Sequence, residues 1–191
     1  MLLIKDIGRK EDRLKELKEK FSDTEKRIKE LESNRVIFPK EAEESKRIIK
    51  QEFEKRGIQC QVRFFAELVE SFTDEKWRPA IETFLGPKRF FIIVDDEYCG
   101  VALNILREKR LFRTNVVLSD KIHESEIVET SASSVLNIKN KAARRYANYL
   151  LNGIHLCDSE DELHEYPKGG IMADGTLSKS YSASLMDIRK T

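Results

Sequence analysis

The sequence RFFIIVDDE, residues 89–97, is an apolar run that ends on three carboxylates. Residues 89–94 are apolar on nearly every position of both faces, which is the pattern of a central strand buried on both sides. Asp95 and Asp96 then precede a helical stretch from Glu97 to about Lys109, because Asp is a favoured N-cap residue. A buried strand followed by a helix indicates α/β layering around this segment.

Further strands and helices are expected after this run and before it. We expect a helix over residues 141–151 and a hairpin turn at Asp174-Gly175, a strong turn pair between apolar residues. The polar segment 119–140 is expected to be a linker between two lobes. The remaining expected elements are short strands at residues 58–62, 115–118 and 153–157.

Residues 1–57 follow a seven-residue apolar repeat instead. Such an a/d seam predicts an arm of a coiled coil, roughly 50 Å long at the helical rise per residue. A single solvated helix docked on its own domain is the alternative. Pro39 should break the helix, and a second helix from about Glu41 should end before Gly57, where the globular part begins. The seam residues are Leu3, Ile7, Leu14, Leu17, Phe21, Ile28 and Leu31.

The composition excludes several classes of protein. Charged residues make up 36% of the chain but leave a net charge of only +1, so the whole molecule is not a strongly basic nucleic-acid binder. Cys60, Cys99 and Cys157 are an odd, widely spaced set, which favours buried thiols over disulfides or a zinc site. Because no apolar run suits a signal peptide or a membrane span, we expect a cytoplasmic protein without membrane contact.

Two stretches, FAELVES at 65–71 and WRPAIETFLG at 77–86, resemble the first part of the hinge domain of SMC-like ATPases. The likeness is to the MukB-like group, and within it to JetC of Wadjet plasmid-defence systems. In that group a glutamate-leucine strand leads into a helix with the pattern W-x-x-A-I-E-x-x-L. Pro79 lies inside this pattern, at a position that suits the first turn of a helix. The residues that carry the likeness are Glu67, Trp77, Ala80, Ile81, Leu85 and Gly86.

The second half carries the same resemblance in ARRYANYLLNG at 143–153, CDS at 157–159 and IMADG at 171–175. It implies a mixed α/β hinge with two pseudo-repeated lobes, about 58–118 and 141–191, preceded by an antiparallel coiled-coil arm. Besides Pro79, two features depart from the pattern of many SMC hinges. A glycine pair, Gly169-Gly170, precedes the Asp-Gly turn, which leaves a different dimer contact open. Few residues follow Leu185, so we expect a fragment that lacks the returning arm.

The resemblance also implies partners and cofactors. The chain would form a homodimer through strand edges, join a partner coiled-coil arm, and work with accessory subunits of an SMC-like complex. ATP and Mg²⁺ would bind head domains outside this sequence, and this chain itself would hold no cofactor and no catalytic residue. Two backbones are expected to approach closely at the glycines Gly153, Gly169, Gly170 and Gly175.

An enzymatic alternative rests on Asp95, Asp96 and Glu97. Carboxylates at the end of a buried strand can hold Mg²⁺, as in Toprim-like nucleases. Helix capping explains the same residues without a metal. His155 and Cys157 share one face of a strand but lack further ligands, so we expect no metal there.

Basic residues gather in two places along the chain. Both clusters suit contact with DNA phosphates, and both also suit solvated helix faces. A stand-alone DNA-binding module is therefore a third hypothesis. The candidate DNA contacts are Lys139, Lys141, Arg144 and Arg145 in one cluster, with Arg110 and Arg113 in the other, which also includes Arg107 and Lys109.

Overall fold

The computed structural model describes residues 13–22 and 38–190 of the 191-residue chain. The chain divides into two compact units, Met1–Ile37 and Phe38–Thr191. In the first unit residues 13–22 are helical, and the seam residues Leu14, Leu17 and Phe21 expose more than half of their surface. The other predicted seam positions lie outside the described residues.

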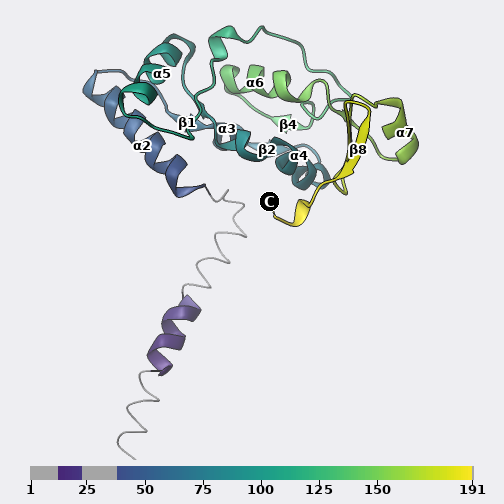
Figure 1. Cartoon of the computed structure of the whole chain (residues 1–191), viewed down its shortest axis with the longest axis horizontal. Helices are drawn as coiled ribbons and strands as arrows, with labels where there is room; N and C mark the ends of the chain where they lie inside the picture. Colours follow the sequence, from purple (N-terminus) through teal and green to yellow (C-terminus); the bar gives the residue numbers. More distant parts are fainter. Residues whose placement is uncertain (1–12, 23–37, 191) are drawn as a thin grey trace, which may run out of the picture. The chain divides into compact units, whose positions relative to one another are not determined.

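The second unit combines short strands with helices (Figure 1). Its helices are α2 (Lys40–Lys55), α3 (Phe65–Leu68), α4 (Arg78–Leu85), α5 (Cys99–Glu108), α6 (Lys141–Leu151) and α7 (Glu160–Glu165). Its strands are β1 (Arg63–Phe64), β2 (Ser71–Phe72), β3 (Ile92–Ile93), β4 (Leu136–Asn137), β5 (His155–Leu156), β6 (Gly169–Ile171), β7 (Thr176–Lys179) and β8 (Ser182–Leu185). Short 3₁₀ turns cover Glu75–Trp77, Gly86–Phe90, Asp96–Tyr98, Ser119–Lys121 and Ile188–Lys190.

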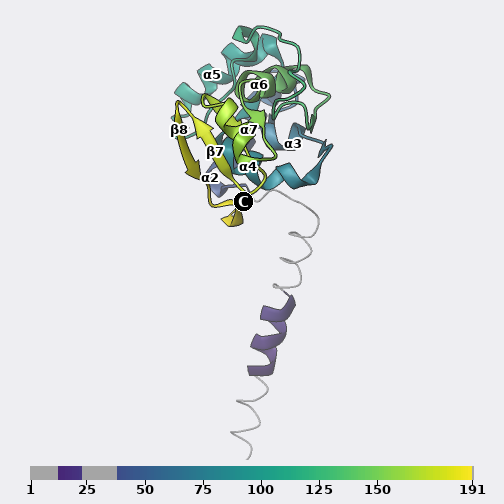
Figure 2. The same cartoon turned by 90° about the vertical axis from the view of Figure 1, so that its right-hand side faces the viewer.

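The strands form three small sheets. β1 pairs with β3 and β2 pairs with β4, both antiparallel. The third sheet has the order β5-β6-β7-β8, in which only the β5–β6 pair is parallel. Figure 1 shows α2 and α5 at one end of the unit and β8 with α7 at the other. Figure 2, turned by 90°, brings this sheet end toward the viewer.

A smaller core joins α2, α5, β1 and β3. Ile49 and Phe53 of α2 are 0% and 1% exposed and share this core with Phe64 and Ile105. We placed the start of the globular part after Gly57, but α2 supplies core side chains, so the compact unit includes it. Pro39 is the N-cap of α2, but the predicted break of the arm there stays a prediction, because residues 23–37 lie outside the described part of the chain.

A larger core packs α4 against α6. The two cores meet at β3, because neighbouring side chains of a strand point to opposite faces, and at the junction of β1 with α3. Ile92 belongs to the smaller core, whereas Ile93 and Phe65 belong to the larger one. Both residues of β3 are buried, as the apolar run predicted, although the strand is short because residues 86–90 form a 3₁₀ turn.

The segment 119–140, which we expected to be a polar linker, is packed in its second half. Ala132 and Leu136 belong to the larger core, and β4 pairs with β2. The serines that made the segment look like a linker are buried with partners: Ser133 donates to Asn148 Oδ1 at 2.6 Å, and Ser131 to Val128 O at 2.7 Å. Hydrogen bonding removes the cost of burying these hydroxyls.

Two expected strands are wrong and two expected elements are confirmed. Residues 58–62 form no strand, because β1 begins only at Arg63. The first part of the 65–71 segment is the short helix α3, closed by Glu67, whose carboxylate accepts the Phe64 N–H at 2.8 Å. Helix α6 has the predicted bounds, and the Asp174-Gly175 turn joins β6 to β7.

Candidate functional site

The two edges of the four-stranded sheet differ in what pairs with them. At the β5 edge, Leu156 N–H donates to Thr130 O at 2.9 Å, and Ala132 N–H donates to Ile154 O at 2.7 Å. Beyond β8, no strand among residues 13–22 and 38–190 pairs with the outer side. All four β8 residues are exposed. We refer to the outer side of Ser182–Leu185 as the open edge.

The turn before β8 sets its hydrogen-bond register. Ser180 and Tyr181 have φ of +52° and +61°, the left-handed pair typical of a type I′ turn. Lys179 and Ser182 flank this two-residue turn and are paired, so they exchange both hydrogen bonds of the closing pair. Neither turn residue is glycine, so the sequence lacked the usual signal for this hairpin.

The register fixes which backbone groups of β8 point outward. Bonded and non-bonded pairs alternate along an antiparallel ladder, so Ala183 and Leu185 occupy the non-bonded positions. The next pair along the ladder, Gly175 with Met186, should again be hydrogen-bonded. The Met186 N–H does donate to Gly175 O, at 2.9 Å. Ala183 and Leu185 therefore direct their N–H and C=O groups away from β7, toward the open edge.

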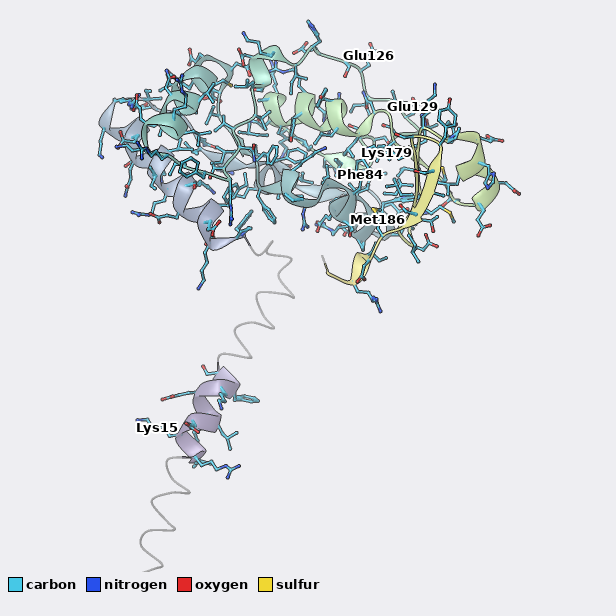
Figure 3. All side chains as sticks on the ribbon, viewed as in Figure 1. Lys15, Phe84, Glu126, Glu129, Lys179 and Met186 are labelled. Carbon is cyan, nitrogen blue, oxygen red and sulfur yellow. The ribbon has the colours of Figure 1, made fainter. Side chains whose placement is uncertain are left out.

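The hairpin is anchored at its base and exposed at its edge. Met186 and Ile188 pack against the larger core, and the Lys179 amino group lies 5.4 Å from the centre of the Phe84 ring of α4. Figure 3 shows Lys179, Phe84 and Met186 gathered on this side of β8. Leu185 remains 73% exposed. β8 is therefore anchored to the core at its base, while its outward N–H and C=O groups and Leu185 face solvent. Such a strand is suited to pair with another strand.

Three of the four predicted interface glycines face this chain's own atoms. A Cβ on Gly169 would lie 2.0 Å from Gly153 O, and one on Gly170 would lie 2.9 Å from Ser178 Oγ. Gly175 has φ of +94° and packs against Met186 O. Only Gly153 has open space around it. Their place in an interface stays a prediction, and substitutions at the first three would disturb folding.

The residues of the W-x-x-A-I-E pattern serve the core. Trp77, Ala80, Ile81 and Leu85 are at most 4% exposed. Gly86 ends α4 with φ of +50°. Glu67 lies elsewhere, where its carboxylate pairs with the Lys46 amino group at 2.5 Å. The apolar residues of the pattern therefore build the fold, and its Glu82 is paired with Arg89 at 2.8 Å.

The acidic cluster is used for an ion pair between distant segments. Asp96 accepts from Arg145 of α6 at 2.5 Å and from Ser119 Oγ at 2.7 Å. Asp95 is the N-cap residue of the 3₁₀ turn that leads into α5. Among the residues that the structure describes, no group of three or more His, Cys, Asp or Glu side chains has an arrangement that could hold a metal. The nuclease alternative therefore gains no support.

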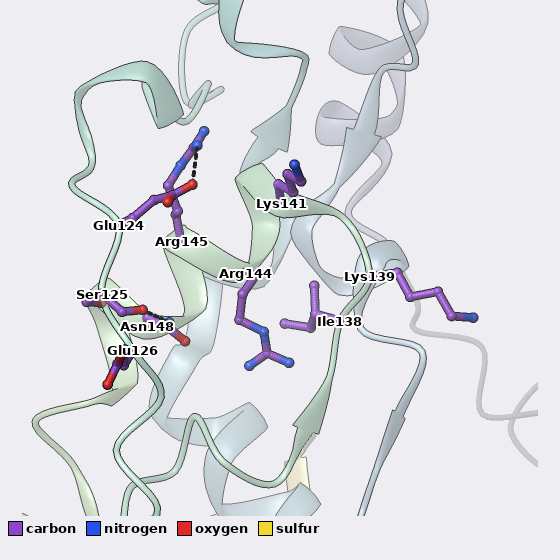
Figure 4. Close-up of a pocket in the computed structure, with 9 residues that line it drawn as sticks. All are labelled: Glu124, Ser125, Glu126, Ile138, Lys139, Lys141, Arg144, Arg145 and Asn148. Atoms are coloured by element: carbon purple, nitrogen blue, oxygen red, sulfur yellow. Dashed lines mark hydrogen bonds and ion pairs between the residues drawn. The ribbon is translucent and has the colours of Figure 1, made fainter.

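In the first basic cluster the two arginines are held by the chain's own acceptors, whereas Lys139 and Lys141 are exposed. Arg144 donates to Ser133 O at 3.1 Å and to Leu136 O at 2.5 Å, and burial lowers the pKa of its guanidinium. Arg145 pairs with Asp96, and Lys139 lies 2.8 Å from Glu70. These side chains line a hollow of about 480 Å³, which Glu124 and Glu126 also line. Figure 4 shows Glu124 facing Arg145 there.

The second basic cluster is more exposed. Arg113 makes a 3.7 Å pair with Glu41, but both side chains are more than three-quarters exposed, so the pair contributes little. Lys109 lies 3.1 Å from Glu52. In the described part of the chain, Arg107 and Arg110 have no ion pair. Phe112, between them and Arg113, is 80% exposed.

The three cysteines and His155 make contacts within the fold and are not arranged as a metal site. Cys99 and Cys157 are buried, and Cys60 is partly so. Burial raises the pKa of Cys60 to about 11 and raises the pKa of Cys157 as well, so both thiols stay protonated. His155 stacks on Tyr166 with ring centres 4.0 Å apart and has Nδ1 3.0 Å from Thr130 Oγ1. None of these contacts forms a metal site.

Sequence reasoning missed the open edge and Phe112. Residues 182–185 alternate serine with Ala183 and Leu185, but no Gly, Asn or Asp turn signal precedes them, so no strand was expected there. Phe112 is an apolar residue that the sequence pattern does not mark as exposed, although it stands between arginines and is 80% exposed.

The described helices also bear on the expectation of no membrane contact. None of them is both long and apolar enough to span a bilayer.

Comparison with known protein families identifies one family that matches this chain. The family described as SMC proteins Flexible Hinge Domain matches residues 61–166, more than half of the chain. A search of the curated proteins finds no match.

Solved structures show the same fold at low sequence identity. An asymmetric dimer of the Geobacillus stearothermophilus SMC hinge domain is similar at 17% identity and TM-score 0.56, over 89% of this chain and 74% of that one. The Pyrococcus furiosus SMC hinge domain is similar at 20% identity and TM-score 0.56, over 80% and 93%. A Pyrococcus furiosus Smc hinge with an extended coiled coil is similar at 21% identity and TM-score 0.55, over 91% and 67%.

Proposed function

The chain belongs to the family of SMC flexible hinge domains, and on that premise we propose that it is a dimerisation hinge whose open edge pairs with a second copy. The observation that carries this proposal is the outward direction of the N–H and C=O groups of Ala183 and Leu185 on β8, an exposed strand whose outer edge pairs with no other strand in the described part of the chain. An edge strand of this kind gains main-chain hydrogen bonds when a strand from another chain lies beside it.

The similar structures support association without fixing its geometry here. One of them is an asymmetric dimer. The β5 edge is already bonded to residues 130–132, so β8 is the edge of this sheet that is free to meet a partner. We assign the contact to strand pairing at β8, with Leu185 providing apolar area beside it.

The hinge would join two arms of an SMC-like ATPase. Leu14, Leu17 and Phe21 lie at seam spacing on the helix of residues 13–22 and are exposed, which supports pairing of that helix with another. In this proposal ATP and Mg²⁺ belong to head domains of the parent protein, and accessory subunits bind elsewhere on it. The hinge itself performs no reaction and holds the two arms together.

The MukB-like and JetC-like assignment is a narrower proposal. It rests on the pattern from Trp77 to Gly86, whose residues lie in the larger core and in the turn that ends α4. The nucleotide sequence around the native gene tests it: neighbouring genes for accessory subunits of such a system would support it, and their absence would count against it.

DNA contact is a second candidate function, favoured by the exposed basic residues Arg107, Arg110 and Arg113. The cluster around Arg144 and Arg145 supports it less, because those side chains already bind this chain's own acceptors.

The first test of dimerisation is absolute mass by light scattering across a concentration series. We would measure the full chain and a shorter chain that begins at Phe38, where the compact unit begins. A dimer in both places the association in the folded unit and supports the hinge. A shorter chain that is monomeric while the full chain is dimeric would move the association to residues 1–37 and contradict the proposal.

A further inference from the structure

A groove lies over helix α6 between two segments of the chain. Residues 124–126 form one wall and residues 138–139 the other, and Arg144 and Asn148 of α6 lie between them (Figure 4). This is the hollow of about 480 Å³ described above, a volume within the range of binding clefts. The groove can therefore admit side chains of another molecule.

The first wall is part of an exposed segment, residues 123–130, which we call the strap. Two side-chain amides hold its backbone on α6: Asn148 Nδ2 donates to Ser125 O at 2.7 Å, and Asn152 Nδ2 donates to Glu126 O at 2.8 Å. The first five residues of the strap make no backbone–backbone hydrogen bond within the described part of the chain. The strap therefore has exposed backbone N–H groups to which another peptide backbone can bond.

The floor of the groove carries positive charge that the chain does not neutralise. Arg144 uses two of its five N–H groups to bond the carbonyl oxygens of Ser133 and Leu136, and it forms no ion pair with any described residue. Burial lowers the pKa of this guanidinium, because desolvation disfavours its charged form. Lys141, exposed at the start of α6, also lacks an ion pair in the described part of the chain. A partly buried cation without a counter-charge is costly, so an incoming carboxylate would be favourable.

The chemistry of the groove favours a peptide carboxylate over a row of phosphates. A guanidinium presents a planar fork of N–H groups that matches a carboxylate. Glu124 and Glu126 also line the groove, so a nucleic-acid strand, with a charge on every nucleotide, would be repelled there. A peptide separates its carboxylates by uncharged backbone and apolar side chains, and Ile138 offers those side chains a contact.

We infer that this groove binds an acidic peptide segment of a partner protein: its carboxylates pair with Arg144 and Lys141, and its backbone lies beside the strap. The segment carries glutamate or aspartate residues separated by apolar ones. Every group of the site belongs to one chain, so the inference goes beyond the proposed hinge and does not depend on the dimer or on the open edge.

The test is fluorescence anisotropy of a labelled, end-blocked peptide of alternating Glu and Val, about eight residues and roughly 26 Å long when extended, titrated with the full chain. Lys141→Gln should weaken its binding about fivefold, as expected for the loss of one exposed charge pair. Arg144→Lys should weaken it about tenfold, because lysine keeps the charge but has no fork. Lys88→Gln is the matched control, because Lys88 is exposed and lies outside the groove, and it should bind like the wild type.

The charge of the peptide and the behaviour of the variants decide the outcome. The same peptide with Gln in place of Glu should not bind, and added salt should weaken binding of the acidic one. Absence of binding by the wild type, or equal binding by Lys141→Gln and Lys88→Gln, would overturn the inference. Displacement of the peptide by an equal concentration of oligo-dT would also overturn it, since the groove would then accept phosphates as readily as carboxylates. Circular dichroism checks the folding of Arg144→Lys, and if that variant is unfolded, the exposed Lys141→Gln decides alone.

Discussion

The β5–β6 side and the β8 side of the four-stranded sheet are built from different residues. Gly169, Gly170 and Ile171 of β6 are all buried, and the chain's own backbone fills the space beside them. The four residues of β8 are all exposed, and two of them direct free backbone groups outward. Both strands belong to one hydrogen-bonded sheet. The comparison separates residues that build the fold from residues that are available for association.

The largest difference should appear when apolar side chains are truncated on the two sides. Ile171→Ala on β6 removes a fully buried side chain and should lower the free energy of unfolding by about 3 kcal/mol through lost burial and a cavity. Leu185→Ala on β8 should change the stability of the monomer by less than about 0.5 kcal/mol. Urea unfolding followed by circular dichroism measures both. Equal losses would show that the β8 side is not open.

A second contrast uses two glycines that face each other. Gly169→Ala would place a methyl group 2.0 Å from the Gly153 carbonyl oxygen, so the backbone must shift, and we expect a loss of about 1–3 kcal/mol in unfolding free energy. Gly153→Ala meets no atom within 4 Å and is the matched control. Thermal melting at one protein concentration compares them. If Gly153→Ala alone abolished the dimer, the original interface prediction for that glycine would gain support.

A third, smaller effect concerns the buried thiol beside β5. Burial raises the pKa of Cys157 above its ordinary value of 9.0, so the folded chain holds this proton more tightly than the unfolded chain. The resulting stability is fully present below pH 9 and falls as pH rises through the folded-state pKa. In Cys157→Ala, the unfolding free energy should therefore fall less steeply with pH above pH 9 than it does in the wild type. An unchanged slope would mean that Cys157 does not contribute to it.

The sequence predicted best where one signal acted alone. The second half of the apolar run, residues 92–94, and one face of the amphipathic helix at 141–151 are buried as expected, and the Asp-Gly turn lies between β6 and β7. In each case apolar periodicity or turn chemistry determines the local structure. The SMC hinge family, inferred from the Trp77–Gly86 pattern and its companions, is confirmed.

The failures share a physical cause, which is that tertiary contacts decided the outcome. Polarity suggested a linker at 119–140, but Ser131 and Ser133 are buried because partners accept their hydroxyl protons. The candidate DNA contacts Arg144 and Arg145 looked free because their acceptors, Leu136 O and Asp96, lie on other elements. The open edge depends on the turn at Ser180 and Tyr181, which starts β8. Both residues have a left-handed backbone, and neither is a residue type that predicts one.

The measurement that tests the account most directly is the mass of Ala183→Pro in solution. Proline removes the outward N–H of Ala183 and leaves the bonds to β7 intact, because an edge strand tolerates proline at an outward position. Ala183→Ser keeps that N–H and is the matched control. We predict that light scattering finds Ala183→Ser dimeric and Ala183→Pro monomeric, with unchanged circular dichroism. A folded Ala183→Pro that dimerises like the wild type would contradict pairing through the open edge.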